Sequence, residues 1–125
     1  YEVTRDDNGK IIKAFGKNDD IEETIVYKYK GNLLAESRSD AFCELSGTHD
    51  TKYSYDDNGQ ITMIVTEGNS DEVMYKHVTT YKYIEYDKKG NWTRAFVVSD
   101  CTETIDDEES TYTTYENVRR KISYY

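Results

Sequence analysis

The chain has 125 residues, a formal net charge of −9 at pH 7 and an isoelectric point near 4.7. Its length suits one domain, and the acidic balance lacks the concentrated basic patch that a nucleic-acid partner requires, so we expect none. No apolar run approaches the roughly 18 residues of a membrane-spanning helix, so we also expect no transmembrane segment.

Aliphatic residues are scarce in this sequence. Leu, Ile, Val and Phe total 23 residues, which together with the net charge is typical of disorder. However, 13 tyrosines can bury ring surface while keeping a hydroxyl for water or a partner. Val, Ile, Thr, Tyr, Phe and Trp make up 48 of the 125 residues, and these types favour pleated, half-buried strands. There is no proline to exclude a strand, so we predict an all-β fold.

A repeated motif is the main organising signal. Its common form is Tyr-x-Tyr-Asp-x-x-Gly, followed by a polar and then an apolar residue, and each copy predicts a strand, a tight turn and a second strand. The first copy has Arg5 in place of the second tyrosine, and the second lacks the Asp-x-x element. Successive turn glycines are 22, 28 and 31 residues apart, which predicts strands that lengthen toward the C-terminus. The copies are residues 1–12, 27–34, 53–62 and 84–93, with turn glycines Gly9, Gly31, Gly59 and Gly90.

Alternation along the predicted strands assigns residues to faces. Residues 21–29 place Tyr27 and Tyr29 on one face, because side chains two apart in a strand point the same way. Residues 61–66 and 92–98 alternate in the same manner. We expect the tyrosine rows to share an interior.

The segment from Glu72 to Asp87 is long for a strand and carries apolar groups on both parities. A bulge near Thr79–Thr80 would reconcile the two parities.

The C-terminal segment has two interpretations. Residues 104–109 resemble a helix start with a capping box, after which residues 112–122 would form a helical stripe. Alternatively, residues 106–109 form an acidic hairpin tip, followed by a strand over 111–125. The Thr- and Tyr-rich composition favours the strand.

The stretch Asp56-Asp57-Asn58-Gly59 is comparable to a calcium loop. With Gly59 as the sixth position of an EF-hand loop, the twelfth position is Val65 rather than glutamate. A type I turn, in contrast, prefers Asp first and Gly fourth, and the glycine can take positive φ at little cost. We therefore predict hairpin turns and no metal site.

No catalytic motif is recognisable. His49 lies in a predicted loop, and His77 is interpreted as an ordinary polar residue of the long strand. The tripeptide Gly68-Asn69-Ser70 is predicted to be a hairpin tip without the ending of a phosphate loop. Cys43 and Cys101 either form one disulfide or are two separate thiols. We expect no catalytic residue, no cofactor and no enzymatic activity.

Exposed aromatic rings are the best functional lead, because sugar rings stack on them. The ligand-binding candidates are Trp92 with Tyr55 or Tyr86, although the scarcity of aliphatic residues favours the alternative that such rings form the core. Asn91-Trp92-Thr93 fits a glycosylation acceptor, but it is also part of the turn motif.

The motifs Tyr53-Ser-Tyr-Asp-Asp-Asn-Gly-Gln and Glu85-Tyr-Asp-Lys-Lys-Gly-Asn-Trp-Thr-Arg resemble the YD repeat of RHS-type proteins. They are still more similar to small secreted or lipid-anchored proteins of gut bacteria, whose final strand ends as residues 120–125 do here. The resemblance implies an antiparallel meander with a porin-like shape and an extracytoplasmic location, periplasmic or on the outer surface. It implies no activity.

We therefore predict one YD-repeat-like β domain over residues 1–125, with the N-terminal part of the full-length protein missing. The fold is an antiparallel up-and-down meander of about 8 to 10 strands, strongly curved or partly closed into a barrel. The leading functional hypothesis is a non-catalytic binding or structural module with a surface glycan or protein partner. The alternatives are a lipocalin-like carrier of a small apolar ligand, a glycan-binding sheet and, last, an enzyme.

Overall fold

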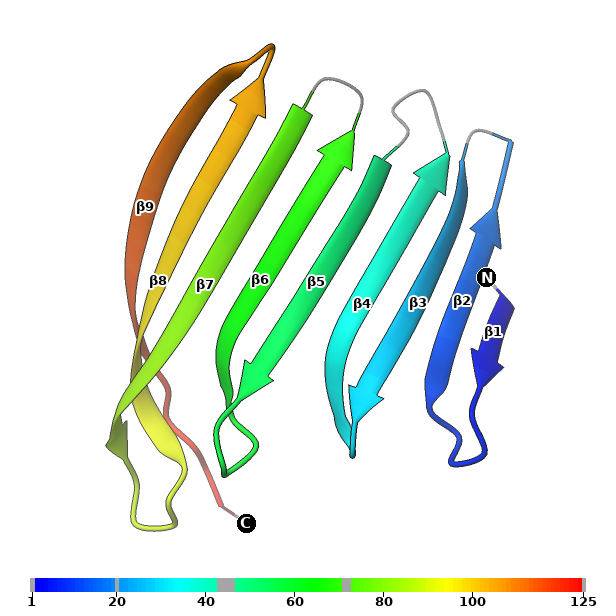
Figure 1. Cartoon of the computed structure of the whole chain (residues 1–125). Helices are drawn as coiled ribbons and strands as arrows, with labels where there is room; N and C mark the ends of the chain where they lie inside the picture. The colour runs from blue at the N-terminus through cyan, green and yellow to red at the C-terminus, as the bar shows by residue number, and fades with distance from the viewer. Residues whose placement is uncertain (1, 20, 43–46, 71–72, 125) are drawn as a thin grey trace.

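The computed structural model describes residues 2–19, 21–42, 47–70 and 73–124. They form one antiparallel sheet in which nine strands follow one another in chain order (Figure 1). No helix occurs in these ranges, so the predicted all-β meander and its number of strands are confirmed. The strands are β1 (Glu2–Arg5), β2 (Ile11–Lys17), β3 (Glu22–Lys30), β4 (Leu33–Phe42), β5 (Gly47–Tyr55), β6 (Ile61–Ser70), β7 (Val73–Tyr86), β8 (Trp92–Ile105) and β9 (Glu108–Arg119).

The repeat corresponds to one pair of strands and places its turn at one end of the sheet. Figure 1 shows the β1–β2, β3–β4, β5–β6 and β7–β8 connections at the same end. Their glycines all have positive φ, between 63° and 83°. The strands lengthen along the chain as predicted, from 7 residues in β2 to 14 in β7 and β8.

Three of these turns share one set of hydrogen bonds, which explains the Asp-x-x-Gly sequence. The Asp56 amide donates to the Gln60 carbonyl at 2.9 Å, and the Gly59 amide donates to the Asp56 carbonyl at 3.0 Å. The Asp56 carboxylate accepts the amides of Asn58 and Gln60 at 2.9 and 3.0 Å. The turns at Asp6 and Asp87 repeat this arrangement. The hairpin prediction is therefore confirmed for these residues.

The connection between β8 and β9 is a two-residue turn at Asp106 and Asp107, whose φ values are 51° and 65°. This turn confirms the acidic hairpin tip, and the helical alternative for this segment is wrong. The strand that follows ends at Arg119, before the predicted end at residue 125. Residues 120–124 instead run on past the end of β9 to the β7–β8 connection, where Asn91 donates a hydrogen bond to the Tyr124 hydroxyl (Figure 1).

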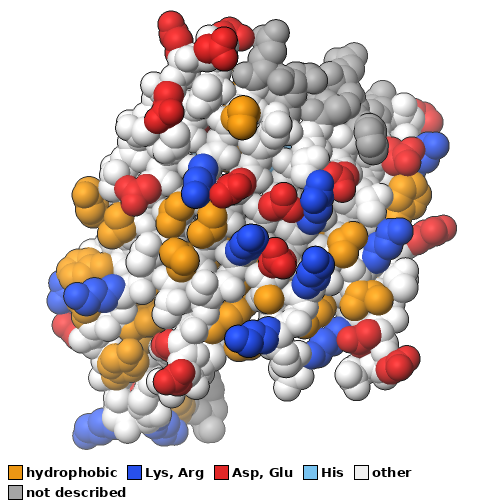
Figure 2. All heavy atoms as spheres, in the orientation of Figure 1, with side chains coloured by type: hydrophobic (Ala, Val, Ile, Leu, Met, Phe, Trp, Pro, Cys, Tyr) orange, Lys and Arg blue, Asp and Glu red, His pale blue; other side chains and the backbone are white. Residues whose placement is uncertain are grey.

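The two faces of the sheet differ in chemistry. Cross-strand partners share a face, so the register assigns every strand residue to one side. The tyrosine face carries Tyr27, Tyr29, Tyr53, Tyr55, Tyr75, Tyr81 and Tyr83. The charged face carries the ion pairs Lys17–Glu22, Arg38–Asp50, Lys52–Glu36 and Lys76–Glu67. Figure 2 shows a face on which blue and red side chains alternate.

The sheet is not closed, and the expected strong curvature is absent. Closure would require β1 to pair with β9, but β1 pairs only with β2 and β9 only with β8 in the described part of the chain. The tyrosine rows do share one face, yet no second layer of described residues covers it. The buried apolar side chains there are Ala14, Ala95 and Cys101, so the expected shared interior is wrong and the rings remain half-buried.

Three local predictions are wrong. His49 lies within β5 rather than in a loop. Gly68, Asn69 and Ser70 continue β6 instead of forming a hairpin tip, and the Tyr75 ring occupies the space that a side chain at Gly68 would need. The bulge in β7 occurs between Tyr83 and Tyr86 rather than at Thr79–Thr80.

The choice between a disulfide and two separate thiols involves Cys43, which lies outside the described residues. Its candidate partner Cys101 is buried in β8 on the tyrosine face.

Candidate functional site

A hollow of about 790 Å³ lies on the charged face and extends from β4 to β8. Its polar lining includes Arg38, Asp40, Thr48 and Asp50 at one end and Glu67 and Lys76 further along. Thr102 and Thr104 of β8 complete the far side. The volume falls in the range typical of small-molecule sites, roughly 300–1,000 Å³.

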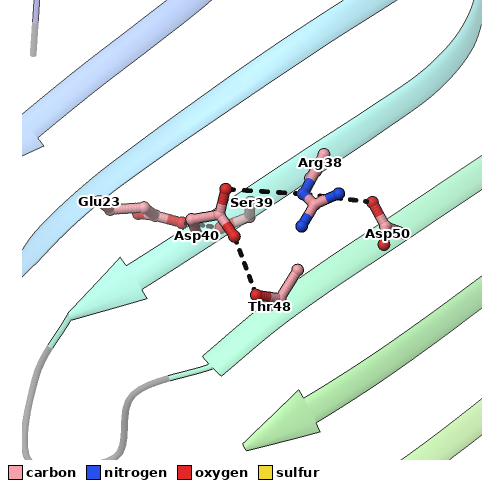
Figure 3. A network of polar contacts seen from close by, with 6 residues as sticks. All are labelled: Glu23, Arg38, Ser39, Asp40, Thr48 and Asp50. Atoms are coloured by element: carbon pink, nitrogen blue, oxygen red, sulfur yellow. Dashed lines mark hydrogen bonds and ion pairs between the residues drawn. The ribbon is translucent and has the colours of Figure 1, made fainter.

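Arg38 organises the β4–β5 end of the hollow. Its Nε atom lies 3.6 Å from Asp40 Oδ2 and 3.9 Å from Asp50 Oδ1. The Thr48 hydroxyl donates to Asp40 Oδ1 at 2.9 Å. Figure 3 shows the Arg38 side chain between the two carboxylates, with Thr48 beside Asp40. The arrangement presents donors and acceptors side by side.

The charged side chains of the hollow are ion-paired and accessible to solvent. The Arg38, Asp40 and Asp50 side chains are 59%, 43% and 47% exposed, so each ion pair contributes only about 0–1 kcal/mol to stability. Across the hollow, Lys76 Nζ lies 3.4 Å from Glu67 Oε1. A ligand could therefore replace water or one ion-pair partner at small cost.

The position of the charges follows from strand geometry. Arg38 is the register partner of Asp50, and Glu67 is the register partner of Lys76. Side chains directly opposite each other in an antiparallel pair lie about 4.5–5.5 Å apart at Cβ, so opposite charges at these positions meet. Alternation keeps them on the side opposite the tyrosines.

Both histidines lie on the tyrosine face, beside Tyr75. His49 Nδ1 shares a hydrogen bond with the Tyr75 hydroxyl, and the rings of Tyr75 and His77 lie 5.1 Å apart between centroids. Burial raises the pKa of the Tyr75 hydroxyl. His77 Nε2 is buried without a hydrogen-bond partner among the described residues. His77 therefore lies in a more enclosed environment than an ordinary polar strand residue.

Cys101 is the direct register partner of His77, and Tyr112 follows on the other side of Cys101. A hydrogen bond with Cys101 is the largest cause that raises the pKa of Tyr112. Within the described ranges, no three or more His, Cys, Asp or Glu side chains are grouped so as to hold a metal ion. The side chains of His77, Cys101 and Tyr112 therefore lie side by side on the tyrosine face.

The three aromatic candidates occupy different environments. Tyr86 is the register partner of Trp92 and is 52% exposed. The Trp92 ring is covered by the Arg120 guanidinium, 3.8 Å from its centroid, and is tilted against Tyr83 at 5.4 Å. Tyr55 lies on β5 and donates its hydroxyl to the Leu34 carbonyl at 2.9 Å. The structure thus brings Trp92 and Tyr86 together, whereas Tyr55 bonds to β4 of the preceding repeat.

The hollow was not recognisable in the sequence, because it depends on the registers of five strands. The alternating charges of β4 to β7 were the available signal.

The chain matches no protein-family model, no curated protein and no solved structure. The resemblance to YD repeats therefore remains a prediction from sequence motifs. In the described ranges, no helix has the length and apolar character required to cross a membrane.

Proposed function

We propose that the protein is a non-catalytic binding module of the bacterial periplasm or outer surface. The observation that carries the proposal is the open, hydroxyl-lined hollow on the charged face. Both cations of the hollow, Arg38 and Lys76, are already ion-paired with carboxylates, so a ligand needs no large net charge. Its size and accessibility favour a small polar ligand or one unit of a polymer.

A saccharide is the ligand class that this chemistry favours. Thr48, Asn69, Thr102 and Thr104 offer hydroxyl and amide groups, and the carboxylates of Asp40 and Asp50 can accept hydrogen bonds from sugar hydroxyls. The carboxylates outnumber the cations among the lining residues, which disfavours polyanions. The extracytoplasmic location rests on the YD-repeat resemblance.

The carrier hypothesis needs an apolar interior inside a closed sheet. The sheet is open and charged side chains line its hollow, so the geometry gives this hypothesis less support. A glycan-binding role for the aromatic candidates would use the exposed Tyr86 more than Trp92, which already contacts Arg120.

A glycan array followed by titration calorimetry tests the proposal. We expect binding that Arg38→Ala and Lys76→Ala each weaken at least about tenfold. Lys52→Ala is a matched control, because Lys52 pairs with Glu36 at 3.9 Å on the same face but does not line the hollow. The proposal fails if no glycan binds, or if the control weakens binding as much as Lys76→Ala.

A further inference from the structure

The long free edge of the sheet is the strand β9. Its twelve residues pair with β8 on one side, from Arg94↔Arg119 to Ile105↔Glu108, without a register shift. No described strand pairs with its other side. Every β9 residue except Val118 is exposed, and Tyr115 is 79% exposed. Such an edge is a template for pairing with another strand.

The backbone groups at this edge can be assigned. The Arg120 amide donates to the Thr93 carbonyl, so even-numbered positions direct their backbone groups toward β8. In an antiparallel ladder the alternate residues point the other way. The odd-numbered residues from Glu109 to Arg119 therefore present unpaired amides and carbonyls to solvent.

Charge is distributed unevenly along β9. It begins with Glu108 and Glu109 and ends with Arg119. Arg119 is the register partner of Arg94, a like charge, and Arg94 is itself held by Glu85 at 3.1 Å. Within the described part of the chain, Arg119 has no ion pair. It lies at the open edge beside a second cation, where an incoming carboxylate would be favourable.

An antiparallel partner strand of the same sequence would supply that carboxylate. We propose that β9 pairs with β9 of a second copy of the chain about a twofold axis through Thr114. This register places Glu109 opposite Arg119 of the other copy, twice per dimer, and pairs eleven residues of each strand. It also uses the odd-numbered residues as the hydrogen-bonded positions, as the free backbone groups require.

Competing registers are less favourable. Residues that pair across the interface must lie on the same face of the continuous sheet. The twofold axis therefore passes where one residue faces its own copy, and not between two neighbouring positions. An axis through Thr113 also pairs eleven residues, but it places Glu109 opposite Asn117 and leaves Arg119 beyond the pairing. Complementary charge therefore selects the axis through Thr114. The assembly stops at two copies, because each copy uses its long edge and, among the described strands, leaves only the four-residue β1 as a free edge.

Sedimentation equilibrium of the full chain tests the interface. We expect a dimer whose dissociation constant rises at least about tenfold in Arg119→Glu and in Glu109→Arg. The double variant Glu109→Arg/Arg119→Glu should recover the dimer, because it restores both ion pairs with reversed sign. Arg119→Glu places an opposite charge beside Arg94, so its loss of the dimer would not reflect unfolding. Lys28→Glu, an exposed change on β3, should leave the dimer intact.

A cysteine cross-link tests the register. In the proposed dimer Thr114 faces its own copy at a position without ladder hydrogen bonds, where paired side chains lie closest. Oxidised Thr114→Cys should form an intermolecular disulfide at residue 114, mapped by peptide mass spectrometry, and Thr113→Cys should not. A chain that stays monomeric at millimolar concentration, a double variant that does not recover the dimer, or cross-linking at residue 113 instead of 114 overturns the proposal.

Discussion

Tyr83 donates its hydroxyl hydrogen to the backbone carbonyl of Ile61, across the β6–β7 pair, at an O···O distance of 2.6 Å. The backbone ladder of this pair stops at Met63↔Thr80, two residues before Ile61. Tyr55 reaches Leu34 and Tyr29 reaches Ile11 in the same way, each at 2.9 Å. The tyrosine hydroxyls thus donate hydrogen bonds to backbone carbonyls that lie beyond the end of the ladder between neighbouring repeats.

Replacing Tyr83 by Phe should lower the free energy of unfolding by about 0.5–1.5 kcal/mol, because it removes this hydrogen bond and keeps the ring. Tyr53→Phe is the matched control, since the Tyr53 hydroxyl has no hydrogen bond in the described part of the chain. Urea denaturation of both variants measures the difference. Equal losses would show that the hydroxyl bond contributes nothing beyond ring packing.

The repeat motif predicted the general position of these tyrosines but not all of their identities. In the sequence, Tyr86 stands in the fourth copy where Tyr55 stands in the third. The irregular register of β7 and β8 between Tyr83 and Tyr86 shifts the later residues, so Tyr83 makes the contact and Tyr86 is exposed. A bulge depends on the pairing with the neighbouring strand, and spacing within one strand does not reveal it.

Gly90→Ala should destabilise the protein by about 1–2 kcal/mol, because Gly90 has a φ of 81° and this left-handed conformation is unfavourable for alanine. No atom lies within 4 Å of the added Cβ, so the cost is conformational and not steric. Gly90→Asn should cost less, since asparagine tolerates this region better. Thermal denaturation of both variants tests this order, and an alanine variant as stable as the wild type would contradict it.

Gly68→Ala should also destabilise the protein, by about 1–3 kcal/mol, but for a steric reason. Its φ is not positive, and the new Cβ would overlap the Tyr75 ring. The cost should therefore disappear in a Tyr75→Ala background, where the ring is absent. A double-mutant cycle measures this coupling, and additive effects would rule out the contact.

The faces of the sheet could be predicted from alternation alone, whereas the hollow could not. Residue parity places Tyr27 and Tyr29 together whatever the neighbouring strand is. The pairing of Arg38 with Asp50 depends on the register of β4 against β5, which alternation within either strand does not reveal. The expected closure failed for a related reason, because strand count and composition do not fix how far a sheet coils.

Calcium should not stabilise the protein. In the Asp56 turn, one carboxylate oxygen already accepts two backbone amides, and the turns at Asp6 and Asp87 are built alike. Melting temperatures with millimolar CaCl₂ and with EDTA should therefore agree. A rise in melting temperature with calcium that Asp56→Asn abolishes would contradict the interpretation of these segments as turns.

Asp87 should titrate at a lower pH than its ordinary value of 3.8, chiefly because the Tyr124 hydroxyl donates a hydrogen bond to it. The amides of Asn91 and Lys89 and the Lys89 charge also lower the pKa of Asp87. A depressed folded-state pKa means that the ionised carboxylate contributes stability above pH 4 or so, which is lost as the pH falls through the folded-state pKa. The same contact raises the pKa of Tyr124, so its contribution is present at neutral pH and is lost under alkaline conditions, as the pH rises through that raised value.

Tyr124→Phe should remove the largest of these causes and shift the pKa of Asp87 upward, toward 3.8. Carboxyl NMR titrations of the wild type and the variant would measure the Asp87 midpoint. The Asp87 resonance should move to a higher midpoint in the variant. An unchanged midpoint would show that residues 120–124 do not hold the β7–β8 turn in solution.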